Sequence, residues 1–159
     1  MTQTPGSPTE VDLEPVRWGV VSTARITEKL LHGASQTALA DIRAVASRDR
    51  EAARSFAARW AIPAAHGSYD ALLADPDIEA VYIPLPNSLH HTWTLRALEA
   101  GKHVLCEKPY SPRAADVSQA FDLAESKGLV LSEGYMYRYN PQIRRLVEIV
   151  EGVGRHVVL

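Results

Sequence analysis

The stretch VRWGVVSTARITEKLLHGAS, residues 16–35, contains two local patterns joined by a short turn. Its first six residues are mostly apolar and rich in valine, which is typical of a buried strand. After small and polar residues at 22–25, apolar side chains recur at helical spacing at Ile26, Leu30 and Leu31. The stretch therefore predicts a strand that leads directly into a helix.

The same alternation of strand and helix patterns continues along the chain. We predict further strands over 41–47, 64–66, 80–85, 103–107 and 129–134, and helices over 49–61, 68–76, 90–101, 113–128 and 141–152. Alternating strands and helices with short connections are typical of a parallel sheet with helices on both faces. We therefore expect an α/β fold with a doubly wound parallel sheet, which binds its ligands at the carboxyl ends of the strands.

The composition is that of an ordinary soluble globular domain, with 159 residues, 46% hydrophobic and 23% charged. A net charge of -2 gives no electrostatic reason to expect nucleic acid or an acidic membrane as partner. We expect no bilayer-spanning segment, and the first residues have neither the basic start nor the apolar run expected of a signal peptide. The single cysteine, Cys106, favours a reducing cytoplasm, and its apolar surroundings predict a buried packing residue rather than a nucleophile.

The domain boundaries follow from composition. Residues 1–15 are rich in proline, threonine and acidic side chains, so we expect a disordered lead-in. The folded domain is expected over residues 16–152. After it, RHVVL at 155–159 reads as a new strand, so we interpret 153–159 as the start of a second, truncated domain.

The turn after the first predicted strand has the position of a dinucleotide-binding turn but not its glycines. Ser22, Ala24 and Thr27 occupy the three positions at which the fingerprint has glycine. All three residues are small, and the N–H groups at the start of the next helix can still bind a phosphate. On this stretch alone, a cofactor turn and an ordinary strand–helix turn both remain open.

Ser47 and Arg48 follow the second predicted strand. An NAD-binding fold usually has an acidic residue there, which binds the ribose 2′-hydroxyl. A hydroxyl and a guanidinium suit a 2′-phosphate instead, because arginine presents a planar and permanently charged fork. Asp49 could still bind a hydroxyl, and Arg48 could simply be a solvated loop charge.

The loop IPLPNSLHH, residues 83–91, follows the fourth predicted strand. Its two prolines stiffen it, so it is well suited to hold a ligand. Asn87 and Ser88 could cap the next helix, a role compatible with ligand binding. His90 and His91 are adjacent and point to different sides of a helix, so we expect no metal site.

Glu107, Lys108 and Pro109 follow the fifth predicted strand. A charged pair is seldom placed on a buried strand, and at the carboxyl edge it would lie in the ligand crevice. A lysine close to a bound substrate can transfer a proton, and Glu107 could orient that lysine or bind the cofactor. The alternative is that Glu107 and Lys108 form an ordinary surface dipeptide without a functional role.

Together these residues resemble the N-terminal domain of the Gfo/Idh/MocA family of oxidoreductases. The resemblance rests on RWGVVSTARI, AVASRD, GSYDALLADPDIEAVYIPLPNSLHH, ALEAGKHVLCEKP and EGYMYRYNPQ, and covers about residues 16–158. It implies a Rossmann domain that binds NADP, with NAD possible, because the first turn is similar to that of the dihydrodiol dehydrogenase and glucose-fructose oxidoreductase branch. Family members transfer hydride between nicotinamide and a secondary alcohol or ketone of a sugar, cyclitol or diol.

The resemblance also implies roles for individual residues. Lys108 is the candidate proton donor or acceptor, with Glu107 in support. Cofactor contacts are expected from Ser22, Thr23, Ala24, Arg25, Ile26, Ser47, Arg48, Leu85, Pro86, Asn87, His90, Glu107, Lys108 and Arg138, while Glu133 and Tyr137 lie near the same strand ends. The family's α+β substrate domain is expected to be absent. The alternative is therefore a non-catalytic dinucleotide-binding module or regulatory subunit, and the oligomeric state is left open.

Overall fold

The computed structural model describes residues 13–152 and contains one six-stranded sheet. All the strand pairs are parallel, and the strand order is β3-β2-β1-β4-β5-β6. The strands are β1 (Val16–Val21), β2 (Ala40–Ala46), β3 (Ala64–His66), β4 (Ala80–Ile83), β5 (His103–Cys106) and β6 (Leu131–Glu133). This order confirms the predicted doubly wound α/β fold.

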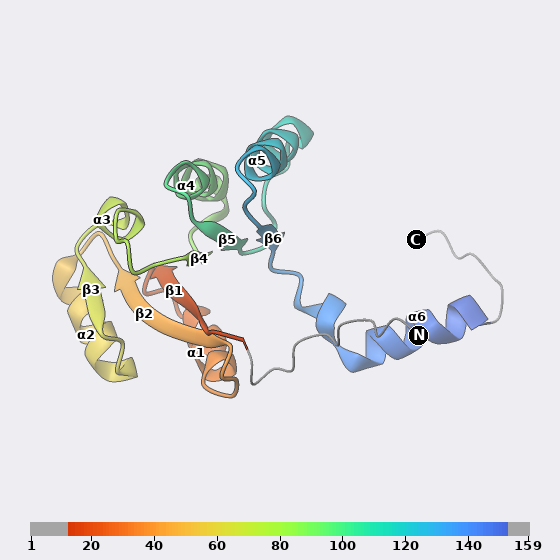
Figure 1. Cartoon of the computed structure of the whole chain (residues 1–159), viewed down its shortest axis with the longest axis horizontal. Helices are drawn as coiled ribbons and strands as arrows, with labels where there is room; N and C mark the ends of the chain where they lie inside the picture. Colours follow the sequence, from red (N-terminus) through yellow and green to blue (C-terminus); the bar gives the residue numbers. More distant parts are fainter. Residues whose placement is uncertain (1–12, 153–159) are drawn as a thin grey trace, which may run out of the picture.

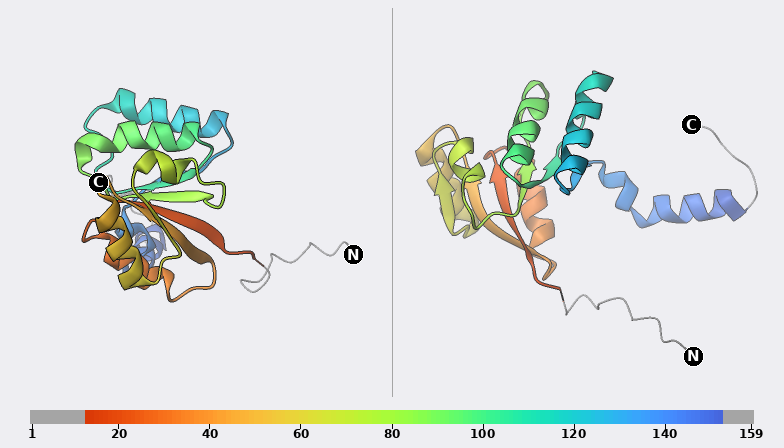
Figure 2. Two further views of the ribbon diagram at one scale, coloured as in Figure 1. Left: turned by 90° about the vertical axis from the view of Figure 1, so that its left-hand side faces the viewer. Right: turned by 45° about the horizontal axis from the view of Figure 1, so that its top comes forward.

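Helices cover the two faces of the sheet in separate groups (Figures 1 and 2). On one face lie α1 (Thr27–Ala34) and α2 (Arg50–Trp60), and on the other lie α3 (Tyr69–Leu73), α4 (Asn87–Glu99) and α5 (Ala114–Ser126). Side chains alternate between these faces along each strand. In β4, for example, Val81 and Ile83 pack in the core beneath α3, α4 and α5, whereas Tyr82 packs in the core beneath α1 and α2.

Gly19 allows α3 to approach the sheet closely. A Cβ atom at this position would lie 2.8 Å from Leu72 Cδ2, a side chain that is fully buried. The β1–β2 register also shifts between Trp18 and Gly19. A residue without a side chain is therefore needed where the first strand passes under α3.

Side chains cap two of the helices at their starts, and the cap predicted for a third helix is absent. The Ser68 side chain accepts a hydrogen bond from Ala71 N and caps α3, as its position predicts. The Asp49 side chain caps α2. The predicted capping of α4 by Asn87 and Ser88 is wrong, because the helix already begins at Asn87. Pro86 occupies the N-cap position, and no side chain caps the helix.

The last helix, α6 (Pro141–Gly152), begins at proline as predicted and extends away from the sheet (Figure 1). It follows a short 3-10 helix, η2 (Met136–Tyr139). None of the residues of α6 is buried. The predicted strand at 155–159 and nearly all of the predicted lead-in lie outside the described residues. None of the helices within residues 13–152 is both long and apolar enough to span a bilayer.

Candidate functional site

The strand register brings the loops after β1, β4, β5 and β6 to one edge of the sheet. Val20 pairs with Tyr82, Tyr82 with Leu105, and Cys106 with Glu133. Because all the strands are parallel, every loop that follows a strand emerges at this carboxyl edge. The loop after β2 joins them, since Val21 pairs with Ala46. The predicted site segments are therefore neighbours in space.

The turn after β1 has the backbone of a glycine turn although it contains no glycine. Ser22 has a φ of 149°, a region that residues with a side chain seldom adopt. Its hydroxyl accepts a hydrogen bond from Ala24 N at 3.0 Å, which holds the turn. Unfavourable backbone conformations persist where the surrounding structure fixes them, often at functional sites. Ser22 thus supplies the conformation that the first glycine of the fingerprint would provide.

The N-terminus of α1 offers polar groups that suit a phosphate. Thr27 is fully buried, and its hydroxyl has no hydrogen-bond partner among the described residues. No side chain caps the helix at Ile26, and Arg25 is exposed beside it. The N–H groups of Thr27, Glu28 and Lys29 donate to the carbonyl oxygens of Ala24, Arg25 and Ile26, so attraction of an anion comes from the helix dipole and the charge of Arg25. The residues present therefore fit the pyrophosphate of a dinucleotide.

The segment after β2 presents an exposed arginine beside a helix cap. Ser47 Oγ accepts a hydrogen bond from Asp49 N at 3.2 Å. Asp49 Oδ1 accepts hydrogen bonds from Glu51 N at 2.8 Å and Ala52 N at 3.2 Å. The Asp49 carboxylate is thus engaged in capping α2, whereas Arg48 is exposed at the sheet edge. Arg48 and Arg50, on either side of Asp49, are both exposed, so positive charge at this point is within reach of a ligand.

The loop after β4 combines buried and exposed residues. Leu85 is buried, whereas Pro86 and Asn87 are exposed. His90 is fully buried, with Nε2 2.7 Å from the Leu85 carbonyl oxygen and Nδ1 2.9 Å from the Pro109 carbonyl oxygen. His90 therefore faces the protein backbone and does not present a ring nitrogen to the crevice.

His91 lies on a different side of α4 from His90. Its Nδ1 is 3.0 Å from Tyr110 Oη, and its Nε2 is 3.2 Å from Gln119 Oε1. Across residues 13–152, no three histidine, cysteine or acidic side chains are grouped so that they could hold a metal ion.

Glu107 is held at the end of β5 by two hydrogen bonds. Tyr82 Oη donates to Glu107 Oε1 at 2.7 Å, and Lys108 N donates to Glu107 Oε2 at 3.2 Å. Burial, and then the Glu107 carboxylate, raise the pKa of Tyr82 well above its ordinary value, so Tyr82 is the proton donor of this pair. Glu107 therefore contacts the backbone of Lys108, while the lysine itself is exposed and is followed by a cis peptide bond to Pro109.

Cys106, directly before Glu107, is a free and fully buried thiol. Burial raises the pKa of this thiol to about 12. Because the thiolate is the nucleophilic form, Cys106 is a packing residue, as its apolar surroundings predict.

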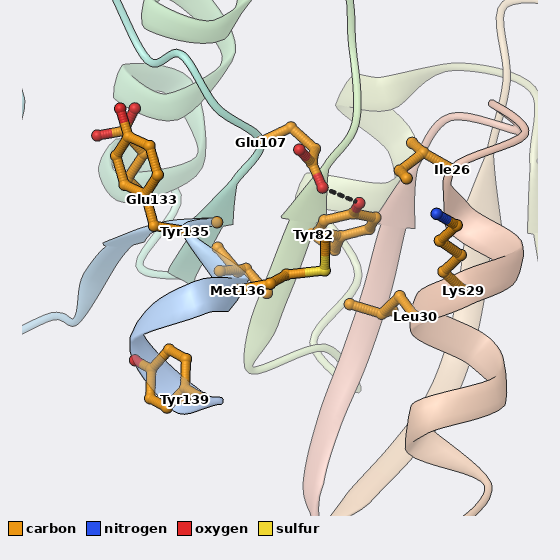
Figure 3. A pocket seen from close by; sticks show the side chains of 11 residues that line it. Ile26, Lys29, Leu30, Tyr82, Glu107, Glu133, Tyr135, Met136 and Tyr139 are labelled. Carbon is orange, nitrogen blue, oxygen red and sulfur yellow. Dashed lines mark hydrogen bonds between the residues drawn. The ribbon is translucent and has the colours of Figure 1, made fainter. Parts of the chain in front are cut away.

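Figure 3 shows an apolar pocket on the α1 side of this edge. The Tyr82–Glu107 hydrogen bond lies between α1 and the segment around η2. The pocket is lined by Ile26, Lys29, Leu30, Tyr82, Leu105, Glu107, Glu133, Gly134, Tyr135, Met136 and Tyr139. Ile26, Glu107 and Glu133 were expected near the site, so the structure adds aromatic and aliphatic walls that the motifs did not indicate.

The sequence analysis did not identify five of the pocket-lining residues, namely Lys29, Tyr82, Tyr135, Met136 and Tyr139. Tyr82 lies in an apolar strand, and its hydroxyl was the one available signal, because a buried tyrosine usually needs a hydrogen-bond partner. Tyr135, Met136 and Tyr139 reach the pocket through tertiary packing that no local pattern specifies.

The predicted residues near β6 divide into two groups. Glu133 Oε1 accepts a hydrogen bond from Tyr110 N at 2.8 Å, so it supports the loop that carries Lys108. Tyr137 and Arg138 are exposed on η2 and do not line the pocket. A cofactor contact from Arg138 stays a prediction.

The strand order of this parallel sheet is that of a dinucleotide-binding domain of the Rossmann type. The turn between β1 and α1 has the position of the phosphate-binding turn in such domains. The Gfo/Idh/MocA model, for an oxidoreductase family with an NAD-binding Rossmann fold, matches residues 16–135. The chain belongs to this family, which confirms the resemblance of its motifs.

The most similar relatives include dehydrogenases and reductases. The chain is 44% identical over 133 residues to D-xylose 1-dehydrogenase (NADP(+)) 2 of Haloferax volcanii, covering 84% of this chain and 41% of that protein. It is 37% identical over 137 residues to trans-1,2-dihydrobenzene-1,2-diol dehydrogenase of Mus musculus, covering 85% and 41%.

Among solved structures, the fold is similar to KijD10, a 3-ketoreductase from Actinomadura kijaniata in complex with NADP and TDP-benzene. The TM-score is 0.81 at 37% identity, covering 87% of this chain and 42% of that one. The chain thus spans about two fifths of the length of these relatives.

The strain at Ser22 can be measured. Ser22→Gly should relieve the positive φ, whereas Ser22→Ala should keep it and lose the hydrogen bond to Ala24 N. In urea unfolding followed by circular dichroism, the glycine variant should therefore be more stable than the alanine variant, by about 1–3 kcal/mol. At Ser118, an exposed position inside α5, the same two substitutions should give the opposite order, because glycine disfavours a helix. Equal stability of the two Ser22 variants would contradict the strained turn.

Proposed function

We propose that the chain is the nucleotide-binding half of an NADP(H)-dependent oxidoreductase that acts on a secondary alcohol or ketone of a sugar, cyclitol or diol. The observation that carries the proposal is the gathering of the Ser22 turn, Arg48 and Lys108 at one edge of the sheet. Each follows the carboxyl end of a different parallel strand, where folds of this type bind dinucleotides.

The cofactor is assigned from the chemistry of this edge. The turn from Ser22 to Ile26, with Thr23, Ala24 and Arg25, would hold the pyrophosphate at the N-terminus of α1. Ser47 and Arg48 would bind the 2′-phosphate, since Asp49 is engaged as a helix cap and Arg48 is exposed. The naming of NADP in several relatives supports this choice over NAD. Leu85, Pro86 and Asn87 would line the path toward the nicotinamide.

Lys108 is proposed as the residue that exchanges a proton with the reacting oxygen. When bound, the cofactor supplies or accepts the hydride. Lys108 is exposed at the end of β5, and its backbone is held by the Glu107 carboxylate. The Tyr82 hydroxyl fixes that carboxylate in turn. A lysine held in this way can donate a proton to a forming alkoxide or accept one from an alcohol.

A second candidate function is a dinucleotide-binding module or regulatory subunit without catalysis. Both candidates include dinucleotide binding. The single, buried Cys106 thiol fits the reducing cytoplasm for either.

Cofactor binding and preference can be tested by calorimetric titration with NADPH and NADH. Arg48→Ala should weaken NADPH binding by about 10- to 100-fold, because a charge-assisted contact to the 2′-phosphate is lost, and should leave NADH binding nearly unchanged. Arg54→Ala is the matched control, since Arg54 is an exposed arginine in the second turn of α2 and pairs with Glu51. An unchanged ratio of NADPH to NADH affinity in Arg48→Ala would exclude the 2′-phosphate role, and no binding of either nucleotide would exclude both functions.

The proton-transfer role can be tested by following nicotinamide absorbance with a panel of sugars, cyclitols, diols and the corresponding ketones. Lys108→Ala should lower turnover by about 100-fold or more, the usual contribution of a general acid or base, with little change in NADPH affinity. Lys127→Ala, an exposed lysine at the end of α5, should behave like the parent chain. Turnover that survives Lys108→Ala would remove Lys108 from the mechanism. NADPH binding without turnover in the parent chain would favour the binding module.

A further inference from the structure

His90 joins two loops of the carboxyl edge through its two ring nitrogens. Nε2 lies 2.7 Å from the carbonyl oxygen of Leu85, and Nδ1 lies 2.9 Å from the carbonyl oxygen of Pro109. Leu85 belongs to the loop after β4, and Pro109 directly follows Lys108 in the loop after β5. The two carbonyls are 24 residues apart in sequence and share one side chain as their partner.

The surroundings of His90 make these contacts strong constraints. The side chain is fully buried, and its contact with the Leu85 carbonyl is buried too, so water cannot readily replace that partner, whereas the contact with the Pro109 carbonyl is partly buried. The ring is planar, with nitrogens at fixed positions, so the separation of the two carbonyls is fixed as well. A neutral imidazole has a single N–H, and it donates to both oxygens at once only when both nitrogens carry protons. The ring anchors the Pro109 carbonyl as a donor when Nδ1 carries a proton, alone or together with Nε2.

Two partly buried carboxylates hold the rest of the lysine loop, the segment 107–113 between β5 and α5. The Glu107 carboxylate accepts from Lys108 N, and Glu133 Oε1 accepts from Tyr110 N at 2.8 Å. Pro109 has no N–H to donate, so its carbonyl is the polar group by which this residue can be anchored. His90 supplies that anchor. The backbone is thus held at each of three consecutive residues, 108 to 110.

We propose that His90 is a positioning residue for Lys108: it fixes the lysine loop after β5 relative to the cofactor loop after β4. This inference rests on the proposed function, in which the Leu85–Asn87 segment lines the cofactor and Lys108 exchanges the proton. It replaces the expectation that His90 itself contacts the cofactor. Misplacement of a reacting group by about 1 Å can lower a rate by two orders of magnitude, which gives such an anchor its value.

A purely structural role would have a different signature. If His90 only filled the core, its replacement would lower the stability of the sheet and loops together. A positioning residue instead controls the opening of one loop, and local openings are measured by amide hydrogen exchange. The amides of Lys108 and Tyr110 report on the lysine loop, and those of Val20 and Val45 report on the sheet.

The experiment compares His90→Gln with the parent chain by amide exchange followed with NMR. Glutamine keeps one hydrogen-bonding amide but cannot span both carbonyls. Exchange at Lys108 and Tyr110 should accelerate about tenfold or more, with less than about threefold change at Val20 and Val45. His66→Gln is the matched control, because His66 is a partly buried histidine that contacts Asp75 Oδ2 at 2.9 Å, away from the lysine loop. It should leave exchange at Lys108 and Tyr110 unchanged.

A second readout follows the lysine itself. After reductive ¹³C-methylation, the Lys108 signal, assigned by its loss in Lys108→Arg, should shift when saturating NADPH is added to the parent chain. In His90→Gln at saturation, this shift should fall by about half or more, because the loop no longer holds the lysine at the cofactor. An undiminished Lys108 shift in His90→Gln would overturn the positioning role.

Two exchange results would also overturn it: unchanged exchange at Lys108 and Tyr110, or equal acceleration at all four amides. If His90→Gln does not fold, hydrogen exchange in the parent chain tests the positioning role instead. There the His90 ring N–H and the Tyr110 amide should have protection factors, each relative to its own intrinsic exchange rate, within about threefold of each other, since one loop opening exposes both. Clearly different protection factors would exclude the shared anchor. Failure of the parent chain to bind NADPH would refute the proposed function, whereas the exchange rates would still decide whether His90 anchors the loop.

Discussion

The hydrogen-bonded register of the parallel sheet is the constraint on which the site depends. Val20 beside Tyr82, and Tyr82 beside Leu105, align the ends of β1, β4 and β5. Parallel pairing sends each following loop to the same edge, and the change of direction in strand order between β1 and β4 opens a crevice there. A shift of one residue in this register would turn Tyr82 to the opposite face and separate its hydroxyl from Glu107.

A few partly buried polar contacts then define the shape of that edge. Tyr82 holds the Glu107 carboxylate, Glu133 holds the Tyr110 amide, and His90 holds two carbonyls. Networks of this kind contribute specificity more than stability, because each member is costly to bury without its partners. The strained Ser22 turn has the same character, since its backbone is unfavourable locally and useful at the start of α1. The conformational preference of a non-glycine residue is thus violated at Ser22, where a ligand is expected to bind.

The sequence was sufficient to predict the strands and helices and the segments that form the site. It was not sufficient to predict which side chains contact one another. Strands such as 80–85 were found because their apolar runs are bounded by turn residues, and the brief strand at 64–66 has the predicted bounds. The start of α4 was misjudged because Pro86, rather than a polar cap, precedes the helix. His90 was assigned to the cofactor path from its position in a motif. Its orientation toward the Leu85 and Pro109 carbonyls depends on tertiary packing that spacing cannot reveal.

We propose that the loops after β1, β2, β4 and β5 form one dinucleotide site. The most direct test is an NMR titration of the ¹⁵N-labelled chain with NADPH, following every backbone amide. The perturbed amides should cluster at the carboxyl edge, at Thr23–Ile26, Ser47–Arg48, Asn87 and Lys108. Perturbations confined to α5, α6 or the opposite edge of the sheet would contradict it.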